Sequence, residues 1–170
     1  MMRADRYGGF TLVELITVIV IIGLIAAVGS PLFFNVTAFR EGGFLEETRA
    51  AMRYAQKLAV ASGCAVQVQV SGNGYALSQV PSGAYVATSP ATCNTPPYSV
   101  TVPDPSNPGN GFTRAAPPGV ALNAVPATFV FCPLGDTSAG ACTGNYAKVN
   151  VSLGVNSQSI TVAGITGFVQ

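Results

Sequence analysis

The residues GGFTLVELITVIVIIGLIAAVGSP, numbers 8–31, decide how the rest of this 170-residue chain is interpreted. Within them, the run from Phe10 to Val28 contains a single charged residue, Glu14. At about 1.5 Å per residue, a helix of this length reaches about 28 Å, which is close to the hydrocarbon thickness of a bilayer. The run therefore predicts a membrane-spanning helix at residues 10–28.

The flanking charges predict how that helix is oriented. Arg3 and Arg6 precede the run and no basic cluster directly follows it, so the positive-inside rule places the N-terminus in the cytoplasm and the rest of the chain across the membrane. A cleaved secretory signal, a plain anchor and a buried core helix are the ordinary alternatives. The run is long for a signal peptide, and a plain anchor leaves Glu14 unexplained, because a carboxylate at bilayer depth costs about 2.5–3.5 kcal/mol without a partner. We therefore expect that partner on another chain.

Composition excludes several kinds of chemistry. The chain has no histidine, and its 8 basic and 7 acidic residues leave a net charge of +1, so histidine-based catalysis, imidazole metal sites and a strong field for polyanions are absent. Beyond Glu47 the acids are Asp104 and Asp136, both in turn-like contexts. A single carboxylate beside Thr137 and Ser138 falls short of a calcium site. We expect no catalytic residues, no cofactor and no metal, and hence no enzyme.

The N-terminal segment resembles that of type IV pilins and type II secretion pseudopilins. The matching features are a basic leader that ends in Gly9, then Phe10, Thr11 and Glu14, an unbroken apolar helix, and Pro31. The resemblance implies that a prepilin peptidase cleaves between Gly9 and Phe10 and that the new amine of Phe10 is methylated. It further implies that Thr11, Glu14 and Pro31 serve assembly, with Glu14 paired to the Phe10 amine of a neighbouring subunit. Pro31 also has an ordinary interpretation as a kink in a membrane helix.

A second segment narrows the resemblance. AAMRYAQKLAVASGCAVQVQV, residues 50–70, is similar to the pattern of GspH/FimT-like pseudopilins and minor pilins, in which an alanine-rich helix leads through a glycine into an alternating strand. Many members carry an arginine after a glycine near the C-terminus, where this chain has Phe168. The resemblance implies an α+β type IV pilin-like fold with a long N-terminal helix packed on an antiparallel β-sheet head. It divides the chain into a leader at 1–9, a helix at 10–62 and a head at 63–170, with 10–28 in the membrane or filament core.

Hydrophobic periodicity places the elements of the head. An apolar stripe predicts an amphipathic helix over 44–62 that lies on a sheet and stops at Gly63, while Gly42-Gly43 predicts a break just before it. Alternation in 66–70 and 75–80 around Ser71-Gly72-Asn73-Gly74 predicts an antiparallel hairpin. The remaining elements are expected as strands near 98–102, 119–124, 127–132, 146–153 and 158–163, with loops at 89–97 and 103–118. The stripe consists of Leu45, Thr48, Met52, Ala55, Leu58, Ala59 and Ser62.

The cysteines predict disulfides and not a metal site. Cys64, Cys93, Cys132 and Cys142 contain no CxxC pair, and an even count in an exported chain favours disulfides. Cys132 and Cys142 are near enough to clip one loop, which would leave Cys64 for Cys93. Three pairings are possible for four cysteines, and the sequence does not choose among them.

These expectations converge on a structural subunit. We expect a minor pilin or pseudopilin in a type IV pilus or a type II secretion pseudopilus, with other pilins, prepilin peptidase and the inner-membrane assembly platform as partners. Before assembly its head would lie in the periplasm of a bacterium. The alternative is a competence pilin that binds DNA through its head. Because the cations beyond residue 57 are only Arg114 and Lys148, and DNA binding needs clustered cations, nucleic-acid binding is not expected.

Overall fold

The protein divides into two compact units, Met1–Val36 and Thr37–Gln170. The computed structural model describes residues 9–33, 36–80, 93–154 and 158–170. Most of the expected leader, residues 1–8, and part of the expected loop at 89–97 lie outside the described residues.

The first unit consists of helix α1, Leu12–Phe33. Apolar residues occupy all sides of α1, in agreement with the run recognised in the sequence. The helix continues through Pro31 to Phe33, five residues beyond the expected end at Val28. The kink expected at Pro31 stays a prediction.

The second unit begins with helix α2, Val36–Ser62. It starts eight residues before the expected position 44 and continues without a break through Gly42-Gly43, so the break expected at these glycines, just before residue 44, is wrong. Each glycine costs about 1 kcal/mol in a helix, but Glu41 and Phe44 on either side are buried, and this packing outweighs the local preference. The expected stop is confirmed, since Gly63 has a φ of 68°, a conformation that favours glycine.

One face of α2 is buried against the strands, as the stripe predicted. Thr48, Met52, Ala55 and Ala59 are fully buried. Leu45 and Leu58 are partly buried and Ser62 is exposed, while Ala51 and Phe44 add to the buried face. Alanine at three of these positions lets the helix approach the strands closely.

The predicted hairpin is present as strands β1, Val66–Ser71, and β2, Gly74–Gln79. The two strands pair antiparallel, with Val66 opposite Gln79 and Ser71 opposite Gly74. The valines of β1 are buried, whereas Gln67 and Gln69 point to the other face. The period-two pattern of the sequence therefore specified both the hairpin and its register.

The hairpin lies in the middle of a six-stranded sheet. The order is β3-β2-β1-β6-β7, and β4 pairs with a second part of β2. The additional strands of this sheet are β3 (Val100–Thr101), β4 (Thr113–Ala115), β6 (Thr128–Phe131) and β7 (Thr137–Ser138).

A second, three-stranded sheet has the order β5-β8-β9. Its strands are β5 (Leu122–Val125), β8 (Val149–Leu153) and β9 (Gln158–Val162). The strands expected near 98–102, 119–124, 127–132, 146–153 and 158–163 are thus confirmed, but they form two sheets where one was expected. Strand β7 was not expected, and β4 lies in the expected loop 103–118, because short edge strands carry no alternation that a sequence pattern detects.

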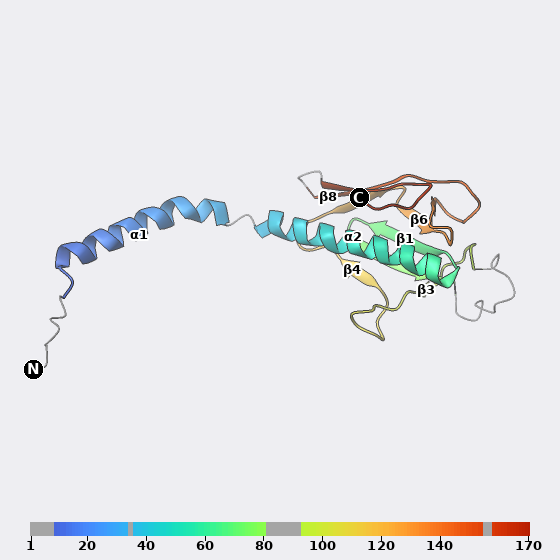
Figure 1. Ribbon diagram of the computed structural model, residues 1–170, viewed down its shortest axis with the longest axis horizontal. Helices are drawn as coiled ribbons and strands as arrows, with labels where there is room; N and C mark the ends of the chain where they lie inside the picture. Colours follow the sequence, from blue (N-terminus) through green and yellow to red (C-terminus); the bar gives the residue numbers. More distant parts are fainter. Residues whose placement is uncertain (1–8, 34–35, 81–92, 155–157) are drawn as a thin grey trace, which may run out of the picture. The chain divides into compact units, whose positions relative to one another are not determined.

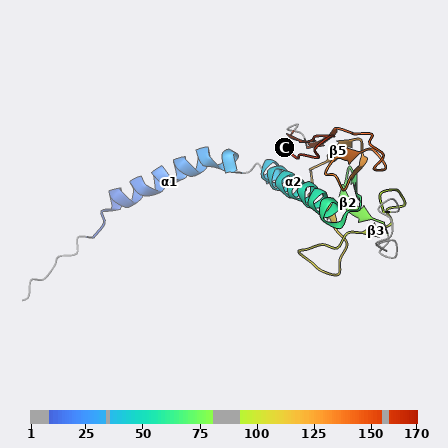
Figure 2. The ribbon, with the colours of Figure 1, turned by 45° about the vertical axis from the view of Figure 1, so that its right-hand side comes forward.

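Both sheets share one hydrophobic core with α2. The core joins Met52 of α2, Phe129 and Phe131 of β6, and Val151 and Ile160 of the second sheet. Figure 1 shows α2 running along the strands of the head, with β1 beside it. After a 45° turn, β2, β3 and β5 all lie to one side of α2 (Figure 2). The expected arrangement of a helix packed on an antiparallel head is confirmed.

The four cysteines form two disulfides, Cys64–Cys93 and Cys132–Cys142. This is one of the three pairings that the sequence left open. All four cysteines belong to a second, smaller apolar cluster. Its other members are Ala65, Val80, Tyr98 and Val130.

The C-terminal residues are attached to α2 by side-chain hydrogen bonds. The Gln56 amide donates to the backbone oxygens of Gly135 at 3.1 Å and Thr166 at 2.8 Å. Arg53 donates to the backbone oxygen of Val169 at 3.2 Å. Two polar side chains of α2 therefore bind the end of the chain, so the last residues belong to the folded head.

The buried face of α2 predicts a large difference between two substitutions on the same helix. We expect Met52→Ala to lower the free energy of unfolding of the full-length protein by about 2–5 kcal/mol, because it leaves a cavity in the shared core. Lys57→Ala, on the exposed face, changes it by less than about 0.5 kcal/mol. Urea unfolding followed by circular dichroism measures both, and equal effects would contradict the assigned core.

Candidate functional site

The Gly9–Phe10 bond lies just before α1, in backbone without regular secondary structure. The Phe10 side chain is 79% exposed, and a Cβ on Gly9 would meet nothing within 4 Å. A protease that binds an extended backbone therefore has access to both residues of the expected cleavage bond.

Thr11 caps the first turn of α1. Its Oγ1 accepts a hydrogen bond from the backbone N–H of Glu14 at 3.3 Å, and its backbone oxygen accepts one from Leu15 at 3.2 Å. Thr11 and Glu14 stand at the spacing of a capping box, in which a threonine and a glutamate three residues later mark a helix start. This structural role was not predicted from the sequence, although the spacing itself indicates it.

Glu14 combines a favourable local position with a free charge. An acidic residue in the first turn is stabilised by the helix dipole by about 0.3–1 kcal/mol. Its side chain is exposed, and no described residue forms an ion pair with it. Phe10, Thr11 and Glu14 therefore gather at the start of α1, whereas Pro31 lies near its other end.

The surface of α1 is apolar on every side. A helix of this kind needs an apolar environment, because an ordinary surface helix confines its apolar residues to one stripe. Within the described parts of the chain, no helix meets the length and hydropathy required to cross a membrane. The large apolar side chains exposed in this segment are Phe10, Leu12, Val13, Leu15, Ile16, Val18, Ile19, Val20, Ile21, Ile22, Leu24 and Ile25.

In the head, Arg114 of β4 is held between two carboxylates. Its guanidinium is 2.8 Å from the Asp104 carboxylate and 2.7 Å from that of Glu47 on α2. It also lies 4.8 Å from the ring centre of Phe112, which stacks on Tyr54 of α2. Arg114 thus joins a loop, an edge strand and α2, which explains why β4 forms without a sequence pattern of its own.

This ion-pair cluster also determines the charge state of Asp104. The backbone N–H of Ser106 donates to the Asp104 carboxylate at 2.8 Å. This hydrogen bond and the neighbouring Arg114 lower the pKa of Asp104 below its usual value. Arg114 is therefore neutralised by its neighbours, and of the two cations beyond residue 57 only Lys148 lacks such a pairing among the described residues.

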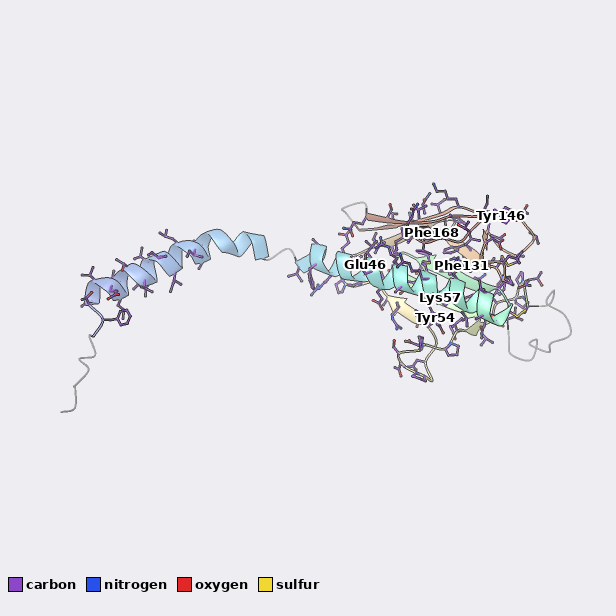
Figure 3. The ribbon with its side chains drawn as sticks, in the orientation of Figure 1. Glu46, Tyr54, Lys57, Phe131, Tyr146 and Phe168 are labelled. Atoms are coloured by element: carbon purple, nitrogen blue, oxygen red, sulfur yellow. A yellow bond between two sulfur atoms is a disulfide. The ribbon has the colours of Figure 1, made fainter. Side chains whose placement is uncertain are left out.

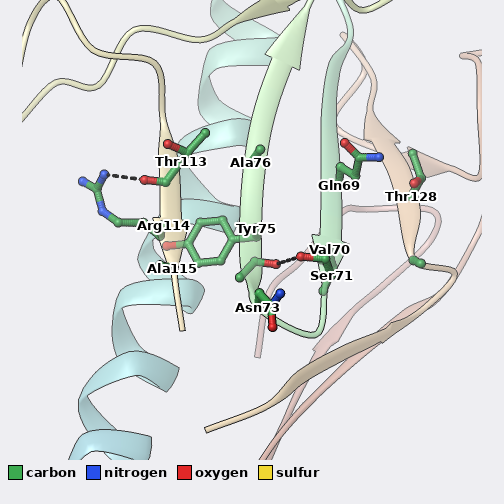
Figure 4. A pocket seen from close by; sticks show the side chains of 12 residues that line it. Gln69, Val70, Ser71, Asn73, Tyr75, Ala76, Thr113, Arg114, Ala115 and Thr128 are labelled. Carbon is green, nitrogen blue, oxygen red and sulfur yellow. Dashed lines mark hydrogen bonds between the residues drawn. The ribbon is translucent and has the colours of Figure 1, made fainter. Parts of the chain in front are cut away.

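A surface cavity of about 610 Å³ lies over the ends of β1, β2 and β4. Hydroxyl, amide and small side chains line it, including Gln69, Ser71 and Thr128. Figure 4 shows the Arg114 side chain on the far side of the cavity from Gln69 and Thr128, bonded to the backbone oxygen of Thr113 at 3.1 Å. No other lining residue is charged, so the cavity lacks the features of an anion site.

The N-terminal segment matches a known family model. Residues 5–30 match the family model described as the prokaryotic N-terminal methylation motif. This match covers the Gly9–Phe10 bond, the capped first turn with Glu14, and most of α1. No curated protein matches the sequence significantly.

Two solved structures are similar to most of the chain. Both are crystal forms of FimU, a type IV minor pilin of Pseudomonas aeruginosa (strain PAO1). The form in space group P21 has a TM-score of 0.51 and 13% identity over 79% of this chain and 89% of that chain. The form in space group P65 has a TM-score of 0.46 and 14% identity over 74% and 86%. On the evidence of the P21 form, this chain has the type IV pilin fold, and residues 5–30 carry the N-terminal methylation motif.

The lowered pKa of Asp104 predicts a stability loss in acid. The ionised carboxyl stabilises the head above its unfolded-state pKa of about 3.9, and this contribution is lost as the pH falls through the lower folded-state pKa. We expect Asp104→Asn to lower the thermal midpoint at pH 7 and to flatten its decline below about pH 4. Glu46→Gln, which breaks the exposed pair with Arg49, serves as the control with little effect. An unchanged acid limb in Asp104→Asn would contradict the role of the cluster.

Proposed function

We propose that this chain is a minor pilin or pseudopilin, a structural subunit that is processed at its N-terminus and assembled into a filament. One observation carries the proposal: a methylation motif at the start of a helix that is apolar on every side, in a chain whose head has the pilin fold. Each part has a use in assembly. The motif is the processing site, the helix is the element that other subunits bury, and the head is exposed on the filament.

Processing begins at the Gly9–Phe10 bond in this proposal. A prepilin peptidase removes residues 1–9, and the new amine of Phe10 is methylated. The exposed position of this bond supports access of the enzyme. Before assembly, α1 holds the subunit in the inner membrane with the head in the periplasm, an oxidising compartment that suits the two disulfides.

Glu14 sets the height at which neighbouring subunits align in the filament. Its carboxylate pairs with the positively charged amine of Phe10 on a neighbouring subunit, and its own helix leaves it free to do so. A buried ion pair contributes little net stability, but removal of one member leaves an uncompensated charge that costs about 3–5 kcal/mol. The interaction therefore penalises a subunit that enters the filament at the wrong height.

Within the pilins, we assign the chain to the GspH/FimT-like minor subunits of a surface pilus or a secretion pseudopilus. This assignment rests on residues 50–70, which resemble the pattern of those proteins. The DNA-uptake alternative would need cations on the head. Because Arg114 is neutralised by Asp104 and Glu47, the exposed positive charge beyond α2 is reduced to Lys148. We therefore favour a structural role over DNA binding.

Cleavage is tested by substitution of the residue before the cut. We expect Gly9→Val to block removal of the leader, because a branched side chain prevents close approach of the backbone to the protease. Mass spectrometry of the intact protein from cells that contain prepilin peptidase should show the full precursor, whereas the parent chain begins at a methylated Phe10.

The precursor from cells that lack the peptidase provides the reference mass. Gly43→Val in α2 provides a matched substitution away from the bond, and it should leave processing unchanged. Normal processing of Gly9→Val, or a parent chain that retains residues 1–9 in the presence of the peptidase, would refute the proposed function.

The registry role of Glu14 predicts a loss of assembly without a loss of processing. We expect Glu14→Gln to lower incorporation into filaments at least tenfold, because the Phe10 amine of a neighbour then lacks its counter-charge in an apolar core. Glu14→Asp should retain part of the incorporation into filaments. Thr17→Val, one turn further along α1, is the control. Incorporation is measured by immunoblotting of sheared filaments, and normal incorporation of Glu14→Gln would contradict the pairing.

A further inference from the structure

The loop after β6 holds an acidic residue in a rigid turn. The backbone N–H of Gly135 donates to the Cys132 oxygen at 2.9 Å, and that of Cys132 donates to the Asp136 oxygen at 2.9 Å. The disulfide from Cys132 to Cys142 fixes the same loop a second time. The Asp136 side chain is therefore presented by backbone that has little freedom to rearrange.

Asp136 is a buried carboxylate, and one of its two oxygens has no partner among the described residues. Its exposure is 6%, and its Oδ1 has no hydrogen-bond partner among the described residues. No described cation forms an ion pair with it. Asp104 provides the contrast, because that equally buried carboxylate accepts hydrogen bonds from Ser106 and pairs with Arg114. Burial of an unpaired carboxylate oxygen is costly, and no described residue offsets that cost at Asp136 Oδ1.

Asp136 lines a small cavity of about 190 Å³. Its walls include Pro133, Leu134 and the Cys132–Cys142 disulfide. Leu134 is 92% exposed and Tyr146, which also lines the cavity, is 57% exposed. Figure 3 shows Tyr146 at the periphery of the head. The cavity is smaller than the roughly 300–1,000 Å³ of small-molecule sites, so it suits a single side chain better than an organic ligand.

Gly144 and Asn94 complete the walls, and Asn94 is held in place by two hydrogen bonds. Its Oδ1 accepts a hydrogen bond from the Ala65 N–H at 2.9 Å, and its backbone oxygen accepts one from the Cys142 N–H at 3.1 Å. The cavity therefore exists before any partner binds, and little conformational entropy is lost on binding.

The chemistry of the cavity selects a cation with an apolar stem. A divalent metal would need several oxygen ligands, but no group of three His, Cys, Asp or Glu residues converges among the described residues. A lysine or arginine side chain fits both features, since its alkyl stem packs on Pro133, Leu134 and Tyr146 while its charged head reaches Asp136. Arginine is among the residues that are enriched at the energetic centres of protein interfaces, where side chains fill well-packed pockets.

We propose that this cavity receives a lysine or arginine side chain of a neighbouring pilin subunit, with Asp136 as its counter-charge. The identity of the partner as a pilin rests on the proposed function, whereas the affinity for a basic side chain does not. The cavity is distinct from the N-terminal site and would provide a contact between heads, where α1 provides the contact between helices.

The test uses the full-length protein in detergent, labelled with ¹⁵N. The probes are Nα-acetyl-lysine amide and Nα-acetyl-arginine amide, with Nα-acetyl-norleucine amide as the neutral isostere and calcium chloride as the metal probe. We expect one or both basic probes to shift the amide resonances of Asp136 and Gly144, and the norleucine and calcium probes to leave them unchanged. A shift with norleucine or calcium, or no shift with either basic probe, would overturn the proposal.

A matched pair of variants locates the effect. Asp136→Asn should weaken binding of the basic probe at least about tenfold, as expected for loss of a charged hydrogen-bond partner. Glu46→Gln, which removes an exposed carboxylate on α2, should leave the binding unchanged. Equal binding by the parent and Asp136→Asn would show that the carboxylate is not the anchor.

The thermal midpoint of Asp136→Asn is a second readout. If Asp136 only stabilised the fold, its substitution would lower this midpoint. We expect the thermal midpoint of Asp136→Asn to equal or exceed that of the parent, because the substitution removes an uncompensated buried charge. A lower midpoint would show that the fold already compensates Asp136, and it would overturn the proposal. Because both measurements use unassembled protein, they are independent of cleavage and of filament formation, so failure of this proposal and failure of the proposed function are distinguishable.

Discussion

The proposed function depends on one constraint, the apolar surface of α1. Side chains such as Leu15, Ile19 and Ile22 are exposed around the helix, and each buried aliphatic side chain is worth about 1.5–3 kcal/mol. A chain that carries such a helix is stable only where lipid or other apolar helices surround it. The rest of the sequence is consistent with this requirement, because the start of the methylation motif, the Thr11 cap and Glu14 all lie at one end of α1. The proposed function follows from the need to bury this helix.

The second unit shows the opposite property, since it is self-contained. Helix α2 and both sheets enclose one core, the two disulfides fix the loops around a second cluster, and Gln56 and Arg53 bind the end of the chain. The ion pairs of Arg114 use acidic groups of the loop and of α2 to neutralise one of the few cations in the head. The part of the head beyond α2 therefore carries few charges, and one of them is the buried carboxylate of Asp136. A low-charge surface with one acidic cavity suits selective contact with other subunits more than attraction of a polyanion.

The features that the sequence predicted are those with local causes. The apolar run, the stripe of α2, the stop at Gly63 and the hairpin at 66–80 each follow from residues adjacent in the chain. The features that it missed depend on distant partners. Helix α2 extends through Gly42-Gly43 because Phe44 packs in the core, strand β4 depends on Arg114 and its acids, and the second sheet arises because β5 pairs with β8. The cavity at Asp136 joins residues near 94, 133 and 146, which no local pattern brings together. Only the capping-box spacing of Thr11 and Glu14 was present in the sequence and missed.

In the proposed function, other pilin subunits cover α1 after assembly. The most direct measurement places a photoreactive amino acid at Ile19, in the middle of α1, and irradiates cells that produce the complete assembly machinery. The account predicts covalent adducts between this position and the N-terminal helices of other pilins, and it predicts their loss in cells that lack the assembly platform. A photoreactive group at Lys148 on the head should not yield adducts with those helices. Absence of pilin adducts at Ile19 in cells with visible filaments that contain the subunit would contradict the account.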